Sequence, residues 1–150
     1  MVVRIAIGSD HGGFDLKEQL RHLLDELKVP YEDFGVFSSE AADYPDIAAP
    51  VARSVADGTF ERGILICGTG IGMSIAANKI PGVRAALVTD VETARLSREH
   101  NDANIMTIGG RTTPVDRARD IVRVFLQAPF DAGGRHSRRV QKISALDCKD

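Results

Sequence analysis

Tryptophan is absent from this chain of 150 residues, aromatic residues make up 5% of it, and only two residues are cysteine. The two, Cys67 and Cys148, lie far apart, and no second ligand-like residue stands near either at metal-site spacing. The sequence therefore indicates neither a disulfide framework nor a zinc site. A chain of this length buries roughly two thirds of its unfolded surface on folding. We expect a single domain, residues 1–150, that folds without such crosslinks.

The sequence also lacks long apolar runs and a strong net charge. No stretch approaches the roughly 20 apolar residues that span a bilayer, and the N-terminal residues lack the basic start and apolar core of a secretion signal. The formal net charge of −2 provides no global positive field for nucleic acid. We therefore expect a cytoplasmic protein that binds neither membranes nor nucleic acid.

What the chain does have is a regular alternation of short apolar runs and amphipathic stretches. The apolar runs predict strands at residues 2–7, 30–36, 64–66, 83–88 and 104–108. The spacing of apolar residues predicts helices at 14–27, 45–56, 73–80, 91–100, 115–126 and 135–146. This alternation is typical of the α/β class. It predicts a three-layer α/β/α, Rossmann-like open sheet of five parallel strands, with a C-terminal helix.

Residues 63–79 combine a strand, a glycine loop and a helix, and they are the most informative segment. The strand ends at Cys67, and glycines follow at 68, 70 and 72. Glycines allow close backbone approach, and free amides at the start of a helix attract negative charge. The same environment favours a thiolate at Cys67, as proton-abstracting base or as nucleophile, although inert packing is the common role of a cysteine at a strand end.

The glycine loop does not match the nucleotide-binding motifs. Its glycines are spaced G-x-G-x-G, not G-x-G-x-x-G, it follows the third predicted strand and not the first, and it lacks the lysine of a P-loop. Dinucleotide binding and nucleotide hydrolysis are therefore disfavoured.

Polar residues follow the ends of all five predicted strands, and in open α/β sheets ligands bind at this carboxyl edge. They are Ser9, Asp10, His11, Asp43, Tyr44, Cys67, Gly68, Thr69, Thr89, Asp90 and Arg111. His11 and Arg111 suggest an anionic substrate. Tyr44 offers a flat wall and a hydroxyl, or a packing contact beside Pro45.

Two further features fall outside that edge. The helix at 91–100 runs back about 15 Å from the carboxyl edge at 1.5 Å per residue, which puts His100 at the opposite edge. His100 is therefore structural or serves a neighbouring subunit. A basic cluster near the C-terminus has, from composition alone, the character of a solvated helix face. It comprises Arg135, His136, Arg138, Arg139 and Lys142.

Six segments taken together resemble the ribose-5-phosphate isomerase B family. They are residues 9–13, 43–45, 66–79, 98–104, 109–111 and 134–136. The resemblance implies an aldose–ketose isomerisation of ribose 5-phosphate and ribulose 5-phosphate through a cis-enediolate, without metal or cofactor. Allose 6-phosphate, galactose 6-phosphate and a tetrose 4-phosphate remain alternative substrates. A non-catalytic sugar-phosphate or nucleotide binding module is a more distant alternative.

The resemblance also implies roles for individual residues. Cys67 is the base, and Thr69 assists proton transfer at the oxygens. Some members of the family carry a glutamate later in the loop as the base, but Met73 stands here, so the chain follows the cysteine pattern. The backbone amides of the loop hold the oxyanion; its residues are Gly68, Thr69, Gly70, Ile71 and Gly72.

The remaining implied roles need two subunits. His100 of the adjacent subunit opens the sugar ring with help from Asp10, and Asn101 hydrogen-bonds near the enediolate. The resemblance therefore implies a homodimer with shared sites, with a tetramer as a further possibility. Substrate phosphate binds His11, Arg111, Arg135 and Arg139, and His136 is a further candidate ligand.

Overall fold

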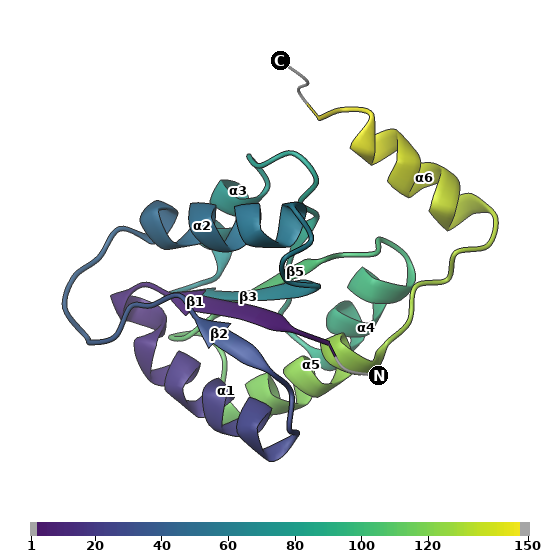
Figure 1. The fold of residues 1–150 in the computed structure, drawn as a ribbon. Helices are drawn as coiled ribbons and strands as arrows, with labels where there is room; N and C mark the ends of the chain where they lie inside the picture. Colours follow the sequence, from purple (N-terminus) through teal and green to yellow (C-terminus); the bar gives the residue numbers. More distant parts are fainter. Residues whose placement is uncertain (1–2, 148–150) are drawn as a thin grey trace.

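A computed structural model describes residues 3–147, in which five parallel strands form one sheet in the order β2-β1-β3-β5-β4 (Figure 1). The strands are β1 (Ile5–Ser9), β2 (Tyr31–Asp33), β3 (Arg62–Cys67), β4 (Ala85–Leu87) and β5 (Ile105–Gly109). A short 3-10 turn, η1 (His11–Gly13), precedes the helices α1 (Phe14–Glu26), α2 (Tyr44–Ala56), α3 (Ile71–Ala77), α4 (Val91–Glu99), α5 (Val115–Gln127) and α6 (Arg135–Ser144).

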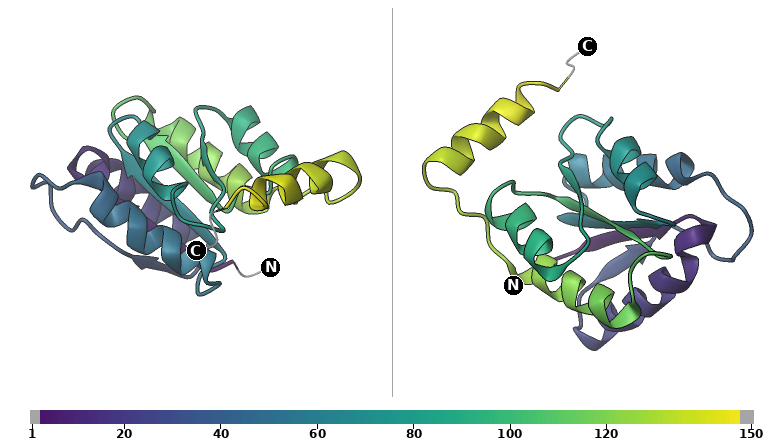
Figure 2. Two further views of the ribbon diagram at one scale, coloured as in Figure 1. Left: turned by 90° about the horizontal axis from the view of Figure 1, so that it is seen from above. Right: turned by 180° about the vertical axis from the view of Figure 1, so that it is seen from behind.

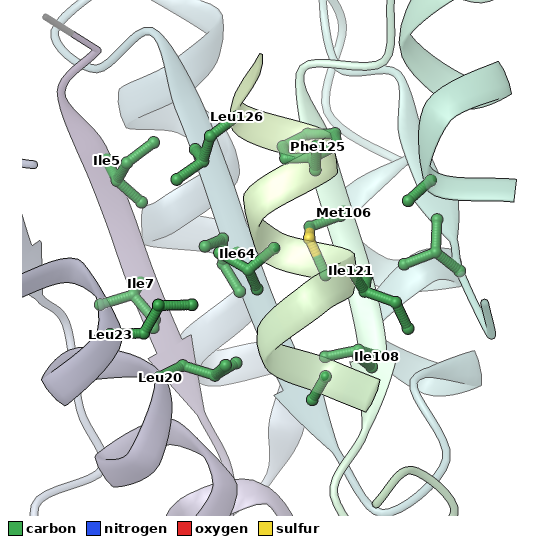
Figure 3. Close-up of a cluster of buried hydrophobic side chains, with 14 of the residues drawn as sticks. Ile5, Ile7, Leu20, Leu23, Ile64, Met106, Ile108, Ile121, Phe125 and Leu126 are labelled. Atoms are coloured by element: carbon green, nitrogen blue, oxygen red, sulfur yellow. The ribbon is translucent and has the colours of Figure 1, made fainter. Parts of the chain in front are cut away.

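Helices cover both faces of the sheet (Figures 1 and 2). Successive side chains of a strand point to opposite faces. Ile5 and Ile7 of β1 therefore pack in one cluster with residues of α1, α4 and α5, whereas Ala6 packs in a second cluster with α2 and α3. Figure 3 shows residues of the first cluster from the sheet, α1 and α5. Both faces are apolar because both are buried, as is usual in parallel sheets. The predicted three-layer α/β/α fold with a C-terminal helix is confirmed.

The strand boundaries differ from the prediction in places that glycine explains. The predicted strand at 30–36 is shortened to Tyr31–Asp33, because Gly35 adopts a φ of +97° that does not fit a strand. The chain nevertheless stays beside β1, since the N–H of Phe34 donates to the carbonyl of Ile7 at 2.8 Å. Ser9 was predicted to follow the first strand, but it is the last residue of β1.

Helix α3 also starts earlier than predicted. Gly70 has a left-handed φ of +82°, which turns the chain so that the helix begins at Ile71 instead of Met73. The three glycines of the loop therefore occupy the turn and the first helical turn.

Helix α6 stands apart from the layered body, at the end of the connection formed by residues 128–134 (Figures 1 and 2). His136 is its one buried residue. The connection is tied to α4 by the N–H of Asp131, which donates to the carbonyl of Glu99 at 2.9 Å. Beyond α6, the carboxylate of Asp147 accepts from the N–H of Gly82. Cys148 lies outside the described residues.

Within residues 3–147, none of the helices combines the length and the apolar character needed to cross a membrane.

Candidate active site

Cys67 is the last residue of β3, a central strand of the sheet. Its side chain is 5% exposed. The Sγ atom accepts a hydrogen bond from the N–H of Gly70 at 3.1 Å, and the Cys67 carbonyl accepts from the N–H of Gly110 at 2.7 Å. Two neighbouring loops therefore contact Cys67, one at its sulfur atom and one at its backbone carbonyl.

The loop after Cys67 depends on glycine at its tightest point. A Cβ atom on Gly70 would lie 2.9 Å from the backbone carbon of Ile108 and 2.7 Å from the side chain of Leu87. The loop is fixed from below as well, because the hydroxyl of Thr107 donates to the Gly70 carbonyl at 2.9 Å. Only glycine combines this approach with a positive φ.

The amides of this loop divide into two groups. The N–H of Gly70 bonds to Cys67 Sγ, and the N–H of Ile71 donates to the hydroxyl of Thr69 at 3.2 Å. The amides of Gly68, Thr69 and Gly72 have no hydrogen-bond partner among residues 3–147. The sequence predicts that the whole loop faces an oxyanion. In this structure three of its amides are open, that is, they have no hydrogen-bond partner among the described residues.

Asp10, Arg111 and the glycine loop meet around Gly12. A Cβ atom on Gly12 would lie 3.2 Å from the amide nitrogen of Gly68, and 3.4 Å from both Asp10 Oδ1 and an Nη atom of Arg111. Asp10 is 7% exposed and accepts from the N–H of Gly13 at 3.1 Å. The N–H of Arg111 donates to the carbonyl of Gly68 at 3.0 Å. A carboxylate, a guanidinium and an open amide therefore lie within a few ångströms of one another.

His11 lies beside the segment that leads into α2. Its Nδ1 atom is 3.1 Å from the amide nitrogen and 3.2 Å from the carbonyl oxygen of Ala42. With Asp43, Asp46 and other residues, His11 lines an open cavity of about 360 Å³. Asp43 lines this cavity and was predicted at this edge.

Tyr44 closes the other side of the loop. A Cβ atom on Gly72 would lie 2.6 Å from the Tyr44 ring, so the ring rests directly on the glycine backbone. The structure therefore brings together most of the predicted residues of the carboxyl edge. They are Asp10, His11, Tyr44, Cys67, Gly68, Thr69, Gly70, Ile71, Gly72 and Arg111.

One residue of this edge has a different task. The carboxylate of Asp90 accepts from the N–H of Thr93 at 2.7 Å and caps α4. Hydrogen bonds from the backbone and the side chain of Thr93 hold the pKa of Asp90 below its ordinary value. Asp90 was predicted to face the crevice, and in this structure its carboxylate caps the N-terminus of α4.

The other predicted residues lie at the amino edge of the sheet, as the length of the helix at 91–100 predicts for His100. The ring of His100, which ends α4, stacks on the ring of His136 with centroids 4.1 Å apart and planes 9° apart. His136 is 7% exposed. Burial, followed by the charges of His100 and Arg135, lowers the pKa of His136. Asn101, Arg135 and Arg139 are exposed.

The predicted site is thus divided between two groups of residues in one chain. Within residues 3–147, no hydrogen bond or ring contact joins the carboxyl-edge residues to His100, Asn101 or the residues of α6. In the same part of the chain, no three histidine, cysteine or acidic side chains are gathered as a metal ion would require.

Comparisons with known proteins agree with this arrangement of motifs. A sequence model of the Ribose/Galactose Isomerase family matches residues 5–143. Ribose-5-phosphate isomerase B of Escherichia coli is 46% identical over 144 residues, 96% of each chain. A ribose-5-phosphate isomerase B structure from Clostridium thermocellum has a TM-score of 0.93 at 51% identity and covers 95% of this chain and 96% of its own.

A type B ribose 5-phosphate isomerase structure from Trypanosoma brucei has a TM-score of 0.94 at 47% identity, over 98% of this chain and 100% of its own. The similarity extends over both the sheet and the residues beyond it. This chain belongs to the ribose/galactose isomerase family.

Proposed function

We propose that this protein interconverts ribose 5-phosphate and ribulose 5-phosphate, as a cytoplasmic enzyme. Membership of an isomerase family and relatives named ribose-5-phosphate isomerase B support the substrate. One observation carries the chemistry: a buried thiol, Cys67, held by an amide hydrogen bond at 3.1 Å beside a loop with open amides. This arrangement suits removal of a proton next to a carbonyl group, since a base and an oxyanion site lie together.

In the proposed reaction, the Cys67 thiolate takes the proton from C2 of the open-chain aldose. The electron pair of the C–H bond forms the C1–C2 double bond of the cis-enediolate, and the carbonyl oxygen O1 becomes the oxyanion. The open amides of Gly68, Thr69 and Gly72 stabilise this negative charge. The hydroxyl of Thr69 assists the transfer of a proton from O2 to O1, and the Cys67 thiol returns its proton to C1. The product is the ketose, and the enzyme regains its starting state.

The remaining steps need the residues of the amino edge. We propose that His100 of a second copy opens the furanose ring with Asp10, and that Asn101 of that copy hydrogen-bonds near the enediolate. His11 and Arg111 bind the phosphate together with Arg135, Arg139 and His136. Guanidinium groups suit this task because their paired donors match phosphate oxygens.

A homodimer is part of this proposal, because the two groups of residues do not meet in one chain. An interface between copies carrying both is the simplest way to complete the site. Exposed apolar side chains near the loop support such an interface: Ile71 is 52% exposed and Ile75 is 60% exposed. Two dimers forming a tetramer would be compatible with it.

A panel of sugar phosphates tests the substrate. We expect the highest kcat/KM for ribose 5-phosphate among ribose, erythrose, allose and galactose phosphates. A higher value for a six-carbon or four-carbon substrate would keep the chemistry and change the substrate. Binding of sugar phosphate without ketose formation under any condition would identify a binding module in place of an enzyme.

A further inference from the structure

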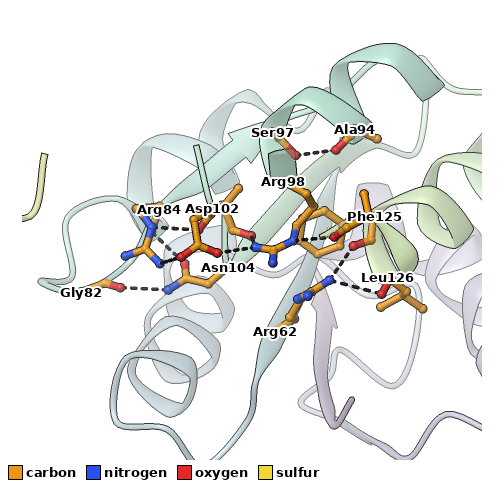
Figure 4. Close-up of polar contacts among 12 residues, drawn as sticks. Arg62, Gly82, Arg84, Ala94, Ser97, Arg98, Asp102, Asn104, Phe125 and Leu126 are labelled. Carbon is orange, nitrogen blue, oxygen red and sulfur yellow. Dashed lines mark hydrogen bonds and ion pairs between the residues drawn. The ribbon is translucent and has the colours of Figure 1, made fainter. Parts of the chain in front are cut away.

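Three arginines meet in a second cavity, at the amino edge of the sheet. The cavity has a volume of about 380 Å³. Arg62, Arg84 and Arg98 line it together with Asp102 and Asn104, which Figure 4 shows, and with Glu61. Its volume falls in the range of about 300–1,000 Å³ that is usual for small-molecule sites. None of these residues has a role in the proposed isomerisation.

The protein itself holds the three guanidinium groups in place. Nη1 of Arg62 donates to the carbonyl of Phe125 at 2.6 Å, at the end of α5. Nη1 of Arg98 donates to Asp102 at 2.8 Å and to the carbonyl of Ala103 at 2.7 Å. Nε of Arg84 donates to the carbonyl of Asp102 at 2.8 Å. The three guanidinium groups are therefore fixed in position before any ligand binds.

Three arginines and two carboxylates, Glu61 and Asp102, line this cavity, so positive charge exceeds negative charge around it. The carboxylate of Asp102 pairs with both Arg84 and Arg98, at 3.4 and 2.8 Å. Within residues 3–147, no carboxylate lies within 4 Å of Arg62. Arg62 is 8% exposed. Its burial and the charge of Arg98 lower its pKa to about 10, while the charges of Asp102 and Glu61 act in the opposite direction. A buried cation that is not in direct contact with a counter-charge is costly, and an anion bound in the cavity would reduce that cost.

Each guanidinium group also keeps unused donors. Nε and Nη2 of Arg62, Nη1 of Arg84 and Nη2 of Arg98 have no partner among residues 3–147. None of these atoms is among the nitrogens shut off from solvent without a partner. They are therefore accessible on side chains that line the cavity.

We propose that this cavity binds a small oxyanion, the phosphate or carboxylate group of a metabolite. Guanidinium donors match the oxygens of both groups. The amide of Asn104 is directed elsewhere, since its nitrogen donates to the Gly82 carbonyl and its oxygen accepts from the Arg84 N–H. The arginines therefore define the specificity for charge.

The cavity differs from the proposed catalytic phosphate site in position and in composition. His11 and Arg111 lie at the carboxyl edge, and neither they nor the arginines of α6 line this cavity. An experiment can therefore remove one anion site and leave the other.

Thermal melting with inorganic phosphate tests the proposal. Sodium chloride keeps the ionic strength constant, and the protein carries Arg111→Gln so that catalytic phosphate binding is weakened. We expect saturating phosphate to raise the melting temperature of this protein by about 5 °C. Adding Arg84→Gln should abolish most of that rise, because Arg84 lines this cavity and is the most exposed of the three arginines. Adding Arg123→Gln, on the outer side of α5, is the matched control and should leave the rise intact.

A phosphate-induced rise that survives Arg84→Gln, or no rise at all, would overturn the proposal. Repeating the measurement with malonate separates the two ligand classes. A larger rise with phosphate indicates a phosphorylated metabolite, and a larger rise with malonate indicates a carboxylate. Isomerase activity is not the readout, so failure of this proposal leaves the proposed function untouched.

Discussion

The two edges of the sheet carry the predicted site residues in different ways. At the carboxyl edge, Cys67 and Asp10 are buried and contact loops that are themselves packed on β5 and η1. At the amino edge, Asn101, Arg135 and Arg139 are exposed, and α6 buries a single side chain, His136. The residues of the carboxyl edge are therefore held in place by the core of their own chain, whereas those of the amino edge are mostly exposed to solvent.

This difference explains why the two regions suit different tasks. A base and an oxyanion site need positions held to within a fraction of an ångström, which a packed sheet edge provides. Residues that bind a distal phosphate, or that act on the substrate of a partner subunit, must extend away from the core of their own chain. A long side chain on an exposed helix can extend in this way. Each prediction below tests one side of this comparison.

The largest effect is expected at the packed edge. Replacing Cys67 by Ala removes the proposed base and should lower kcat by about 10³- to 10⁴-fold. Sugar phosphate should still bind, because the proposed phosphate ligands are unchanged. Exchange of the C2 proton with solvent, followed by NMR, measures the step directly. Exchange at the wild-type rate would remove Cys67 from this role.

The second prediction tests whether the exposed edge serves another copy. His100→Ala and Cys67→Ala proteins, each inactive alone, are mixed and allowed to exchange subunits. About a quarter of wild-type activity should return with random pairing, and at most about half, since each hybrid dimer contains one intact site. A mixture of His100→Ala protein with itself is the control. If subunits exchange and activity stays absent, His100 does not act in the partner's site.

The third prediction compares two glycines, one from each region. A Cβ atom on Gly13 would lie 2.5 Å from the carbonyl oxygen of Ile66, whereas on Gly133 the nearest atom is 3.6 Å away. Gly13→Ala should therefore reduce the free energy of unfolding by about 2 kcal/mol. Gly133→Ala should change it by no more than about 0.5 kcal/mol. Urea denaturation of both variants measures the difference, and equal losses would contradict the proposed contrast in packing.

The sequence predicted the layers of this fold because apolar periodicity records burial. Strand β3 is buried on both faces, and its sequence therefore contains a continuous apolar run, Ile64–Ile66. The ends of elements were less predictable. Gly35 and Gly70 change the direction of the chain because both adopt a positive φ. Glycine adopts positive and negative φ about equally readily, so the sequence alone does not show where such a turn occurs.

The site was predictable where motifs follow strand ends, whereas the capping contacts of individual carboxylates were not. Asp10 caps η1 and Asp90 caps α4, and neither contact was read from the sequence. The arginine cavity was not predicted at all. Arg62 begins β3, Arg84 directly precedes β4 and Arg98 lies in α4, so their convergence depends on how these three elements pack.

The smallest expected effect concerns the contact of His136 with His100. Burial lowers the pKa of His136 below its ordinary value of about 6.5. The released histidine therefore binds a proton more readily than the docked one, and docking is weakened as the pH falls below about 6.5. Arg135, Arg139 and His100 add positive charge and favour the same direction, while Asp131 opposes it.

Hydrogen exchange of the α6 amides, corrected for the intrinsic effect of pH, measures this docking. Protection in the wild-type protein should decrease between pH 7.5 and pH 5.5. His136→Phe keeps a flat ring for stacking and removes the titration, so its protection should stay constant over the same interval. His22→Gln, on the exposed side of α1, should behave like the wild type. Equal loss of protection in the wild type and in His136→Phe would show that another group controls the position of α6, and that the exposed edge is held by contacts other than this histidine pair.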